Sequence, residues 1–322
     1  MTTKNVLTMK LTLALDWTPN VNHAGLYLAQ INGYYQEAKL EVEFISTDID
    51  NYTRKPIERL AAREVDFAMG PSEHLITYRK LKEPKIPIIA VATIMQKETS
   101  AFVTLASSGI DRPAKLDHKT YAGYKTVLET NLITEMIRND GGEGKINLIT
   151  PPRLNVFEGF LQGQADTCWV FMPWEGVIAA HRGMALNAFY LNDYGVPYGY
   201  SPLIMTHEDI LAHKEEAFQK FLQATAQGYR EAAQHPEATA ELLTKNIDHA
   251  NFEEEAFIRK TMQAIAPSLL GNEGHWGIMQ HQKWESYTHW LIDHKMLQHN
   301  DGSLGKKEDV EISAFYTNKL LG

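Results

Sequence analysis

The sequence predicts an α/β protein of two lobes, each built on a mixed sheet and joined to the other by two hinge strands. Short apolar runs alternate with helical patterns over most of the 322 residues, which is typical of mixed α/β sheets. A chain of this length is long for a single core. Polar and aromatic crossover segments at 96–102 and 194–201 enclose a middle segment of about 100 residues, a usual size for one lobe.

These crossovers divide the chain into a discontinuous first lobe and a continuous second lobe. We expect residues 1–100 and 202–322 in the first lobe and residues 101–201 in the second. Hinges are expected at 96–102 and 198–205. Because lobes joined in this way can close over a small ligand, the arrangement predicts a binding cleft between them.

Each element before the first crossover follows from its local pattern. Residues 11–15 form a short apolar run, which predicts a buried strand. In residues 40–45, apolar side chains alternate with acidic ones, which predicts a strand with one exposed face. Ser72 is expected to cap the helix that follows it. The predicted strands are 11–15, 40–45, 65–69 and 86–94, and the predicted helices are 25–35, 54–63 and 72–80.

Strands and helices continue to alternate as far as the second crossover, after which the chain becomes largely helical. Pro236 stands at the start of one of these late helices, where proline is favoured. In the middle segment, strands are predicted at 101–105, 120–123, 146–149, 167–171 and 186–191, with helices at 127–139, 154–162 and 174–182. The later predicted helices are 208–212, 214–234, 236–245, 253–265 and 278–295.

Composition excludes several classes of function. Charged residues make up 22% and apolar residues 44%, which is ordinary globular usage. The net charge of -9 argues against nucleic acid as a partner, because phosphate binding needs a basic surface. No run reaches the ~18–20 apolar residues of a membrane span, so direct membrane insertion is not expected. The single cysteine, Cys168, is expected to be a small buried hydrophobe.

The first ten residues lack the continuous apolar region and the small-residue cleavage site of a secretory leader. Two alternatives for the location stay open. The chain is cytoplasmic, or it is extracytoplasmic and its leader was removed.

The segment after the first strand gives the strongest signal of a binding site. Trp17, a proline turn, Asn20, Asn22 and His23 follow residues 11–15 in quick succession, and a helical pattern begins after them. In α/β sheets small ligands bind at the carboxyl ends of strands. A flat indole beside amide and imidazole groups suits a planar, nitrogen-rich ligand. The alternative is that Trp17 is a buried residue that covers the end of the strand.

A histidine and glutamate cluster near the end of the chain offers potential metal ligands. His281, Glu285 and His289 recur every four residues and so share one face of a predicted helix. The cluster lacks the His-Glu-x-x-His spacing of zinc hydrolases, and a solvated polar face explains it better. No metal is expected.

Several segments together resemble one family of periplasmic-binding-protein-like proteins. The most specific is Leu15-Asp16-Trp17-Thr18-Pro19-Asn20 with His23 and Gly25. The similarity extends to residues 32–35, 65–68, 94–100, 165–166, 174–176 and 228–229, and so covers nearly the whole chain. This family contains bacterial proteins that deliver thiamine-precursor pyrimidines to ABC transporters, and fungal thiamine-pyrimidine (hydroxymethylpyrimidine) synthases. The resemblance implies a type II periplasmic-binding-protein fold with the ligand between the lobes.

Two departures separate the chain from the synthases. The resemblance implies that synthases form an aldimine between pyridoxal phosphate and a lysine, beside an active-site histidine. Here His74 matches that histidine, but Gly70 stands in place of the lysine, so the amine is missing. The cysteine-rich iron motif would fall at residues 197–201, which contain no cysteine. We therefore expect no cofactor, and His74 is a catalytic candidate only if the chain is an enzyme after all.

The favoured hypothesis is a monomeric solute-binding protein that captures a thiamine-precursor aminopyrimidine or similar small heterocycle for an ABC permease. Trp17 would stack on the ring. The resemblance places Glu129 at a glutamate of the transport proteins, and Glu73 and Glu175 are further acceptors for a ring amine. The expected ligand-binding residues are Trp17, Asn20, His23, Ser72, Glu73, His74, Tyr124, Glu129, Trp169, Trp174, Glu175 and Tyr198. A divergent hydroxymethylpyrimidine phosphate synthase and a cytoplasmic small-molecule sensor stay open as alternatives.

Overall fold

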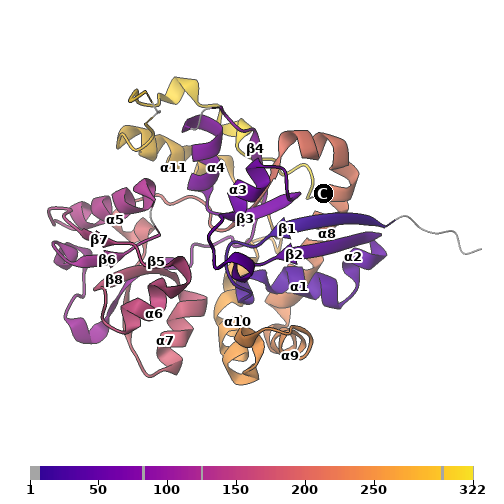
Figure 1. Cartoon of the computed structure of the whole chain (residues 1–322), viewed down its shortest axis with the longest axis horizontal. Coiled ribbons are helices and arrows are strands. Elements are labelled where there is room, and N and C mark those ends of the chain that lie inside the picture. Colours follow the sequence, from indigo (N-terminus) through magenta and orange to yellow (C-terminus); the bar gives the residue numbers. More distant parts are fainter. Residues whose placement is uncertain (1–7, 82–83, 125, 299–300, 322) are drawn as a thin grey trace, which may run out of the picture.

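Two five-stranded mixed sheets, each flanked by helices, form two lobes that lie side by side (Figure 1). The computed structural model describes residues 8–81, 84–124, 126–298 and 301–321. The strand order is β2-β1-β3-β10-β4 in the first sheet and β7-β6-β8-β5-β9 in the second. The chain passes from the first sheet to the second between β4 and β5, and it returns between β9 and β10.

The first sheet combines parallel and antiparallel pairs. Strand β1 is parallel to β2 and β3, whereas β10 is antiparallel to both β3 and β4. Its strands are β1 (Met9–Ala14), β2 (Leu40–Ile45), β3 (Phe67–Gly70), β4 (Ile88–Thr93) and β10 (Leu203–His207). The helices from the same parts of the chain are α1 (Ala24–Ile31), α2 (Tyr34–Glu37), α3 (Pro56–Ala61), α4 (Ser72–Ile76), α8 (Glu208–Gln234), α9 (Pro236–Asn246), α10 (Glu255–Leu269) and α11 (His281–Asp293).

The second sheet is also mixed. Strand β6 is parallel to β7 and β8, and β5 is antiparallel to β8 and β9. Its strands are β5 (Ser100–Leu105), β6 (Thr120–Ala122), β7 (Asn147–Ile149), β8 (Thr167–Phe171) and β9 (Leu186–Phe189), and its helices are α5 (Val127–Asn139), α6 (Val156–Leu161) and α7 (Val177–His181).

Every strand predicted from the sequence is present, β2 and β8 with the predicted bounds and the others with ends that differ by a few residues, but β10 was not predicted. All five residues of β10 are buried, so the segment lacks the alternation that marks a half-exposed strand. The segment 198–205, predicted as a hinge, therefore ends inside a central strand of the first sheet. The lobe boundaries at 1–100, 101–201 and 202–322 stay predictions.

Three local predictions need correction. The predicted helix 25–35 is divided into α1 and α2, because Gly33 takes a left-handed conformation with φ 78°. Ser72 is the first residue of α4, and Pro71 occupies the capping position. The two helices predicted at 208–212 and 214–234 form one helix, α8, with a kink at Lys214.

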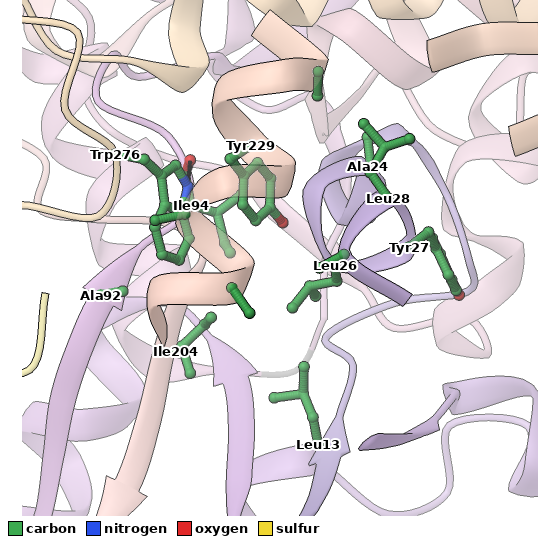
Figure 2. Close-up of a cluster of buried hydrophobic side chains, with 14 of the residues drawn as sticks. Leu13, Ala24, Leu26, Tyr27, Leu28, Ala92, Ile94, Ile204, Tyr229 and Trp276 are labelled. Carbon is green, nitrogen blue, oxygen red and sulfur yellow. Dashed lines mark hydrogen bonds between the residues drawn. The ribbon is translucent and has the colours of Figure 1, made fainter. Parts of the chain in front are cut away.

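Helices α1 and α8 pack closely and hold the segment that follows β1. A Cβ atom added at Gly25 would lie 2.2 Å from the Tyr229 ring, and one at Gly228 would lie 2.1 Å from the Gly25 carbonyl oxygen. Figure 2 shows Tyr229 beside Trp276 and next to α1; the two rings are stacked with centroids 4.7 Å apart. The Tyr229 hydroxyl donates to the carbonyl oxygen of Asn22 at 2.7 Å. This core therefore fixes the polar turn between β1 and α1.

Two further sequence predictions are confirmed: Cys168 is fully buried, and Pro236 is the first residue of α9. None of the helices in the described ranges combines the length and the apolar composition that a bilayer crossing requires.

Candidate functional site

A cavity of about 140 Å³ lies between the two sheets. Its walls are formed largely by the turns that follow β1, β3, β6 and β8, and strand ends of this kind are where α/β proteins bind ligands. The lining residues are Asp16, Trp17, Asn20, Asn22, Tyr52, Pro71, Glu73, His74, Ser100, Tyr124, Thr126, Glu129, Arg153, Trp169, Val170, Phe171, Trp174, Glu175, Tyr198 and Ser201.

Trp17 is a partly exposed residue on this wall. Its ring centroid lies 5.4 Å from that of Tyr52 and 5.8 Å from that of Tyr124, which follows β6 of the second sheet. The indole is therefore not enclosed in one lobe, and it adjoins space that a flat ligand could occupy.

Asn20, Asp16 and His23 form a hydrogen-bonded unit in the turn after β1. The Asn20 side chain accepts from the Asn22 amide at 2.8 Å and donates to the Thr18 carbonyl at 2.9 Å, so it stabilises the turn. His23 is fully buried and does not line the cavity. Its Nδ1 accepts from the Asn20 amide, which leaves the ring proton on Nε2, 2.8 Å from Asp16 Oδ1. His23 thus orients the Asp16 carboxylate from behind the wall.

Ser72 also lies behind the wall, where its fully buried hydroxyl accepts from the Tyr200 amide at 3.2 Å. Its neighbour Glu73 lines the cavity and accepts from the Tyr198 hydroxyl at 2.9 Å. Burial raises the pKa of Glu73 to about 7, so this group exchanges a proton near neutral pH. Burial, together with the positive charges of Lys55 and Arg153, lowers the pKa of His74 to about 3, and its imidazole is neutral at physiological pH.

Glu129 is held by hydrogen bonds within the second lobe. Its Oε1 accepts from the Tyr121 hydroxyl and the Tyr124 amide, and its Oε2 accepts from the same amide and from the Thr126 hydroxyl. Burial raises the pKa of Glu129. Because a carboxylate accepts about four hydrogen bonds, Glu129 has little capacity left for a ligand.

The turn after β8 supplies Trp174 and Glu175. The Trp174 ring packs against Phe257 of α10, with centroids 5.2 Å apart. Glu175 Oε2 accepts from the Phe171 amide at 3.0 Å. Burial raises the pKa of Glu175 to about 7, and the negative charge of Asp16 adds to that rise. Trp169, in β8 itself, donates from its indole nitrogen to the Ser100 hydroxyl at 3.0 Å.

The structure thus places all predicted ligand-binding residues except His23 and Ser72 on the cavity wall. Sequence reasoning missed Asp16, Asn22, Tyr52 and Arg153. Asp16 and Asn22 stood within the motif after the first strand, whereas Tyr52 and Arg153 lie in connecting segments without a motif. The Arg153 guanidinium lies 5.1 Å from the Tyr52 ring centroid and donates to the Tyr124 carbonyl.

No group of three or more His, Cys, Asp or Glu side chains within the described ranges is arranged to hold a metal ion. The described residues of the cavity wall also include no lysine and no cysteine.

Comparison with known proteins assigns the family. Residues 20–239 match the sequence profile described as NMT1/THI5 like. The chain belongs to the NMT1/THI5-like family. Among relatives of this NMT1/THI5-like chain is the formylaminopyrimidine-binding protein of Halalkalibacterium halodurans, 25% identical over 88% of this chain and 85% of that protein. Another relative is the 4-amino-5-hydroxymethyl-2-methylpyrimidine phosphate synthase of Legionella pneumophila. It is 22% identical over 98% of this chain and 93% of that protein.

A solved structure supports the same fold. A Candida albicans protein, described as exhibiting the generic periplasmic binding protein structural fold, aligns with a TM-score of 0.66 over 96% of each chain, at 16% identity. The NMT1/THI5-like chain therefore has the type II periplasmic-binding-protein fold, and both the predicted fold class and the family resemblance are confirmed.

Proposed function

We propose that this chain is a solute-binding protein that captures a thiamine-precursor aminopyrimidine between its lobes for delivery to an ABC permease. The observation that carries the proposal is the indole of Trp17, which faces a cavity also lined by acidic side chains from both sheets. The name of the Halalkalibacterium halodurans relative, a formylaminopyrimidine-binding protein, supports this ligand class.

The wall matches the chemistry of such a ligand. A flat heteroaromatic ring can stack on an indole, and Trp17 with Tyr124 offers an aromatic surface from each lobe. Amino groups on the ring are donors, and the carboxylates of the wall are acceptors. Because the cavity draws its residues from both lobes, a bound ligand would favour their closure.

Calorimetric titration tests the proposal. The folded wild type is expected to bind formylaminopyrimidine or 4-amino-5-hydroxymethyl-2-methylpyrimidine. The Trp17→Ala variant is expected to bind at least about 10-fold more weakly, since it loses an aromatic stacking partner. Trp290→Ala is the matched control, because Trp290 of α11 stacks on His294 and does not line the cavity. Absence of binding to every aminopyrimidine by the folded wild type would overturn the proposal.

The presence of His74 on the wall favours a pyrimidine synthase as a second candidate. Gly70 adjoins it, since a Cβ added there would lie 3.2 Å from His74 Nδ1. The described wall does not fit the aldimine chemistry of that class, because no described lining residue supplies an amine. Addition of pyridoxal phosphate is expected to produce no aldimine absorbance band; an aldimine band in the wild type that borohydride reduction makes resistant to dialysis would favour the enzyme.

A further inference from the structure

We infer that Asp16, Asn22 and Glu175 determine ligand specificity, and that together they select a heteroaromatic amine bound in its protonated, donor-rich form. The inference deepens the proposed function and rests on it. Asp16 and Asn22 come from the turn after β1, and Glu175 comes from the turn after β8. All three line the same cavity.

Each of these side chains has an oxygen atom that the described part of the protein leaves without a hydrogen bond. Asp16 contacts His23 through Oδ1 only, and its side chain is 12% exposed. Glu175 accepts from the Phe171 amide through Oε2, and no hydrogen bond from another described residue reaches its Oε1 atom. The Oδ1 atom of Asn22 is buried and has no partner, although the residue is only 2% exposed. A buried polar atom of this kind is costly unless something completes its hydrogen bonding.

Asn20 and Asn22 both line the cavity, but Asn22 is the one whose side-chain oxygen has no partner. Both polar atoms of the Asn20 side chain are used within the turn: Oδ1 accepts from the Asn22 amide, and Nδ2 donates to the Thr18 carbonyl. The backbone of Asn22 is fixed on both sides, by Asn20 and by the Tyr229 hydroxyl, so its side chain is well positioned. A free amide held in this way suits ligand recognition.

Asp16 and Glu175 each bring an acidic group to the same cavity, one after β1 of the first sheet and one after β8 of the second, and the charge of Asp16 acts on Glu175. Among the described residues, the side-chain partner of Asp16 is His23, whose Nδ1 accepts a hydrogen bond from the Asn20 amide. Arg153, the described arginine on the wall, contacts Tyr52 and Tyr124 instead. A positively charged donor between the two carboxyl groups would relieve their repulsion.

These features define the chemistry of the ligand. Three unsatisfied acceptors call for several N–H donors, and two carboxyl groups favour a positive charge among them. A heteroaromatic ring with an amino group next to a protonated ring nitrogen meets both requirements. Glu129, whose oxygen atoms are already engaged, is not expected to provide this discrimination.

Paired ligands test the inference without any substitution. Calorimetry on the wild type compares 4-amino-5-hydroxymethyl-2-methylpyrimidine with its analogue that lacks the 4-amino group. Hydrogen bonds to charged groups predict a preference of about 10- to 100-fold for the amino compound.

Substitutions give a second test. Affinity for the amino compound is expected to fall by about 10-fold, and the preference over the analogue is expected to shrink, in each of three variants: Asp16→Asn, Glu175→Gln and Asn22→Ala.

Glu158→Gln is the matched control, because Glu158 is exposed, pairs with Arg182 and does not line the cavity. Asp16→Asn keeps an acceptor for His23, and thermal unfolding of each variant verifies its fold. If the wild type binds no pyrimidine, the proposed function fails. If the wild type binds both compounds equally, or if folded Asp16→Asn and Glu175→Gln bind as the wild type does, this inference fails while the proposed function stands.

Discussion

Glu73 is a buried carboxylic acid whose protonation links the cavity wall to protein stability. Only 6% of the residue is exposed, and burial raises its pKa from 4.5 to about 7. The folded state therefore retains a proton that the unfolded state releases above pH 4.5. As a consequence, the contribution of Glu73 to the free energy of unfolding falls as pH rises from about 4.5 to about 7, and it is constant above that range.

The Glu73→Gln variant is expected to remove this pH dependence, since glutamine resembles the protonated acid. Its free energy of unfolding, relative to the wild type, is expected to be about 2–3 kcal/mol higher at about pH 8 than at about pH 5. Urea unfolding at both pH values measures the difference. Glu175 titrates in the same range, but both proteins contain it, so its contribution to the free energy of unfolding cancels in the comparison. A difference that does not change with pH would show that Glu73 ionises normally in the folded protein.

The candidate site could be predicted in part from the sequence. The indole and polar turn after the first strand indicated the wall correctly, because strand ends are common binding positions. The sequence could not show which asparagine was free, since the hydrogen bonds of Asn20 depend on the path of the turn. Arg153 was missed because only tertiary packing brings it against Tyr52.

At the scale of elements, the contact between α1 and α8 depends on the absence of a side chain at Gly25. Gly25→Ala is expected to lower the free energy of unfolding by about 1–3 kcal/mol, because the new methyl group overlaps the Tyr229 ring. Ligand affinity is expected to fall as well, since Tyr229 holds the carbonyl of Asn22. Urea unfolding and calorimetry measure the two effects.

Gly271→Ala provides the control for this substitution. The nearest atom to an added Cβ at Gly271 is 3.5 Å away, an ordinary contact, so a change of about 0.5 kcal/mol or less is expected. Equal stability of the two alanine variants would contradict the assigned role of Gly25.

Element prediction succeeded for half-exposed strands and also for buried apolar runs such as those of β3 and β5. Strand β2 was predicted with its observed bounds, because its acidic and apolar residues alternate. Strand β10 carries no such pattern, and its place between β3 and β4 depends on residues distant in the sequence. The division of the first helix at Gly33 likewise follows from a backbone conformation that the helical spacing does not reveal.

At the scale of the whole molecule, Phe257 connects the lobes outside the cavity. It lies on α10, yet its ring packs against Trp174 of the second lobe. Phe257→Ala is expected to weaken ligand binding by about 2- to 10-fold, because Trp174 of the cavity wall loses the aromatic ring that packs against it. Calorimetry measures the affinity, and small-angle scattering compares the compactness of the two proteins.

Phe157→Ala is the matched control, because Phe157 is a partly buried phenylalanine that stacks on Phe160 and does not line the cavity. If Phe257→Ala binds the ligand as tightly as Phe157→Ala does, the contact with Trp174 does not contribute to ligand binding.

The position of β10 has a consequence for the order in which a nascent chain can fold. This strand lies between β3 and β4, although it follows the whole second sheet in the sequence. The first sheet therefore cannot be completed until Leu203–His207 has left the ribosome. All strands of the second sheet lie within residues 100–189, so the later-starting lobe has its full set of strands first during synthesis.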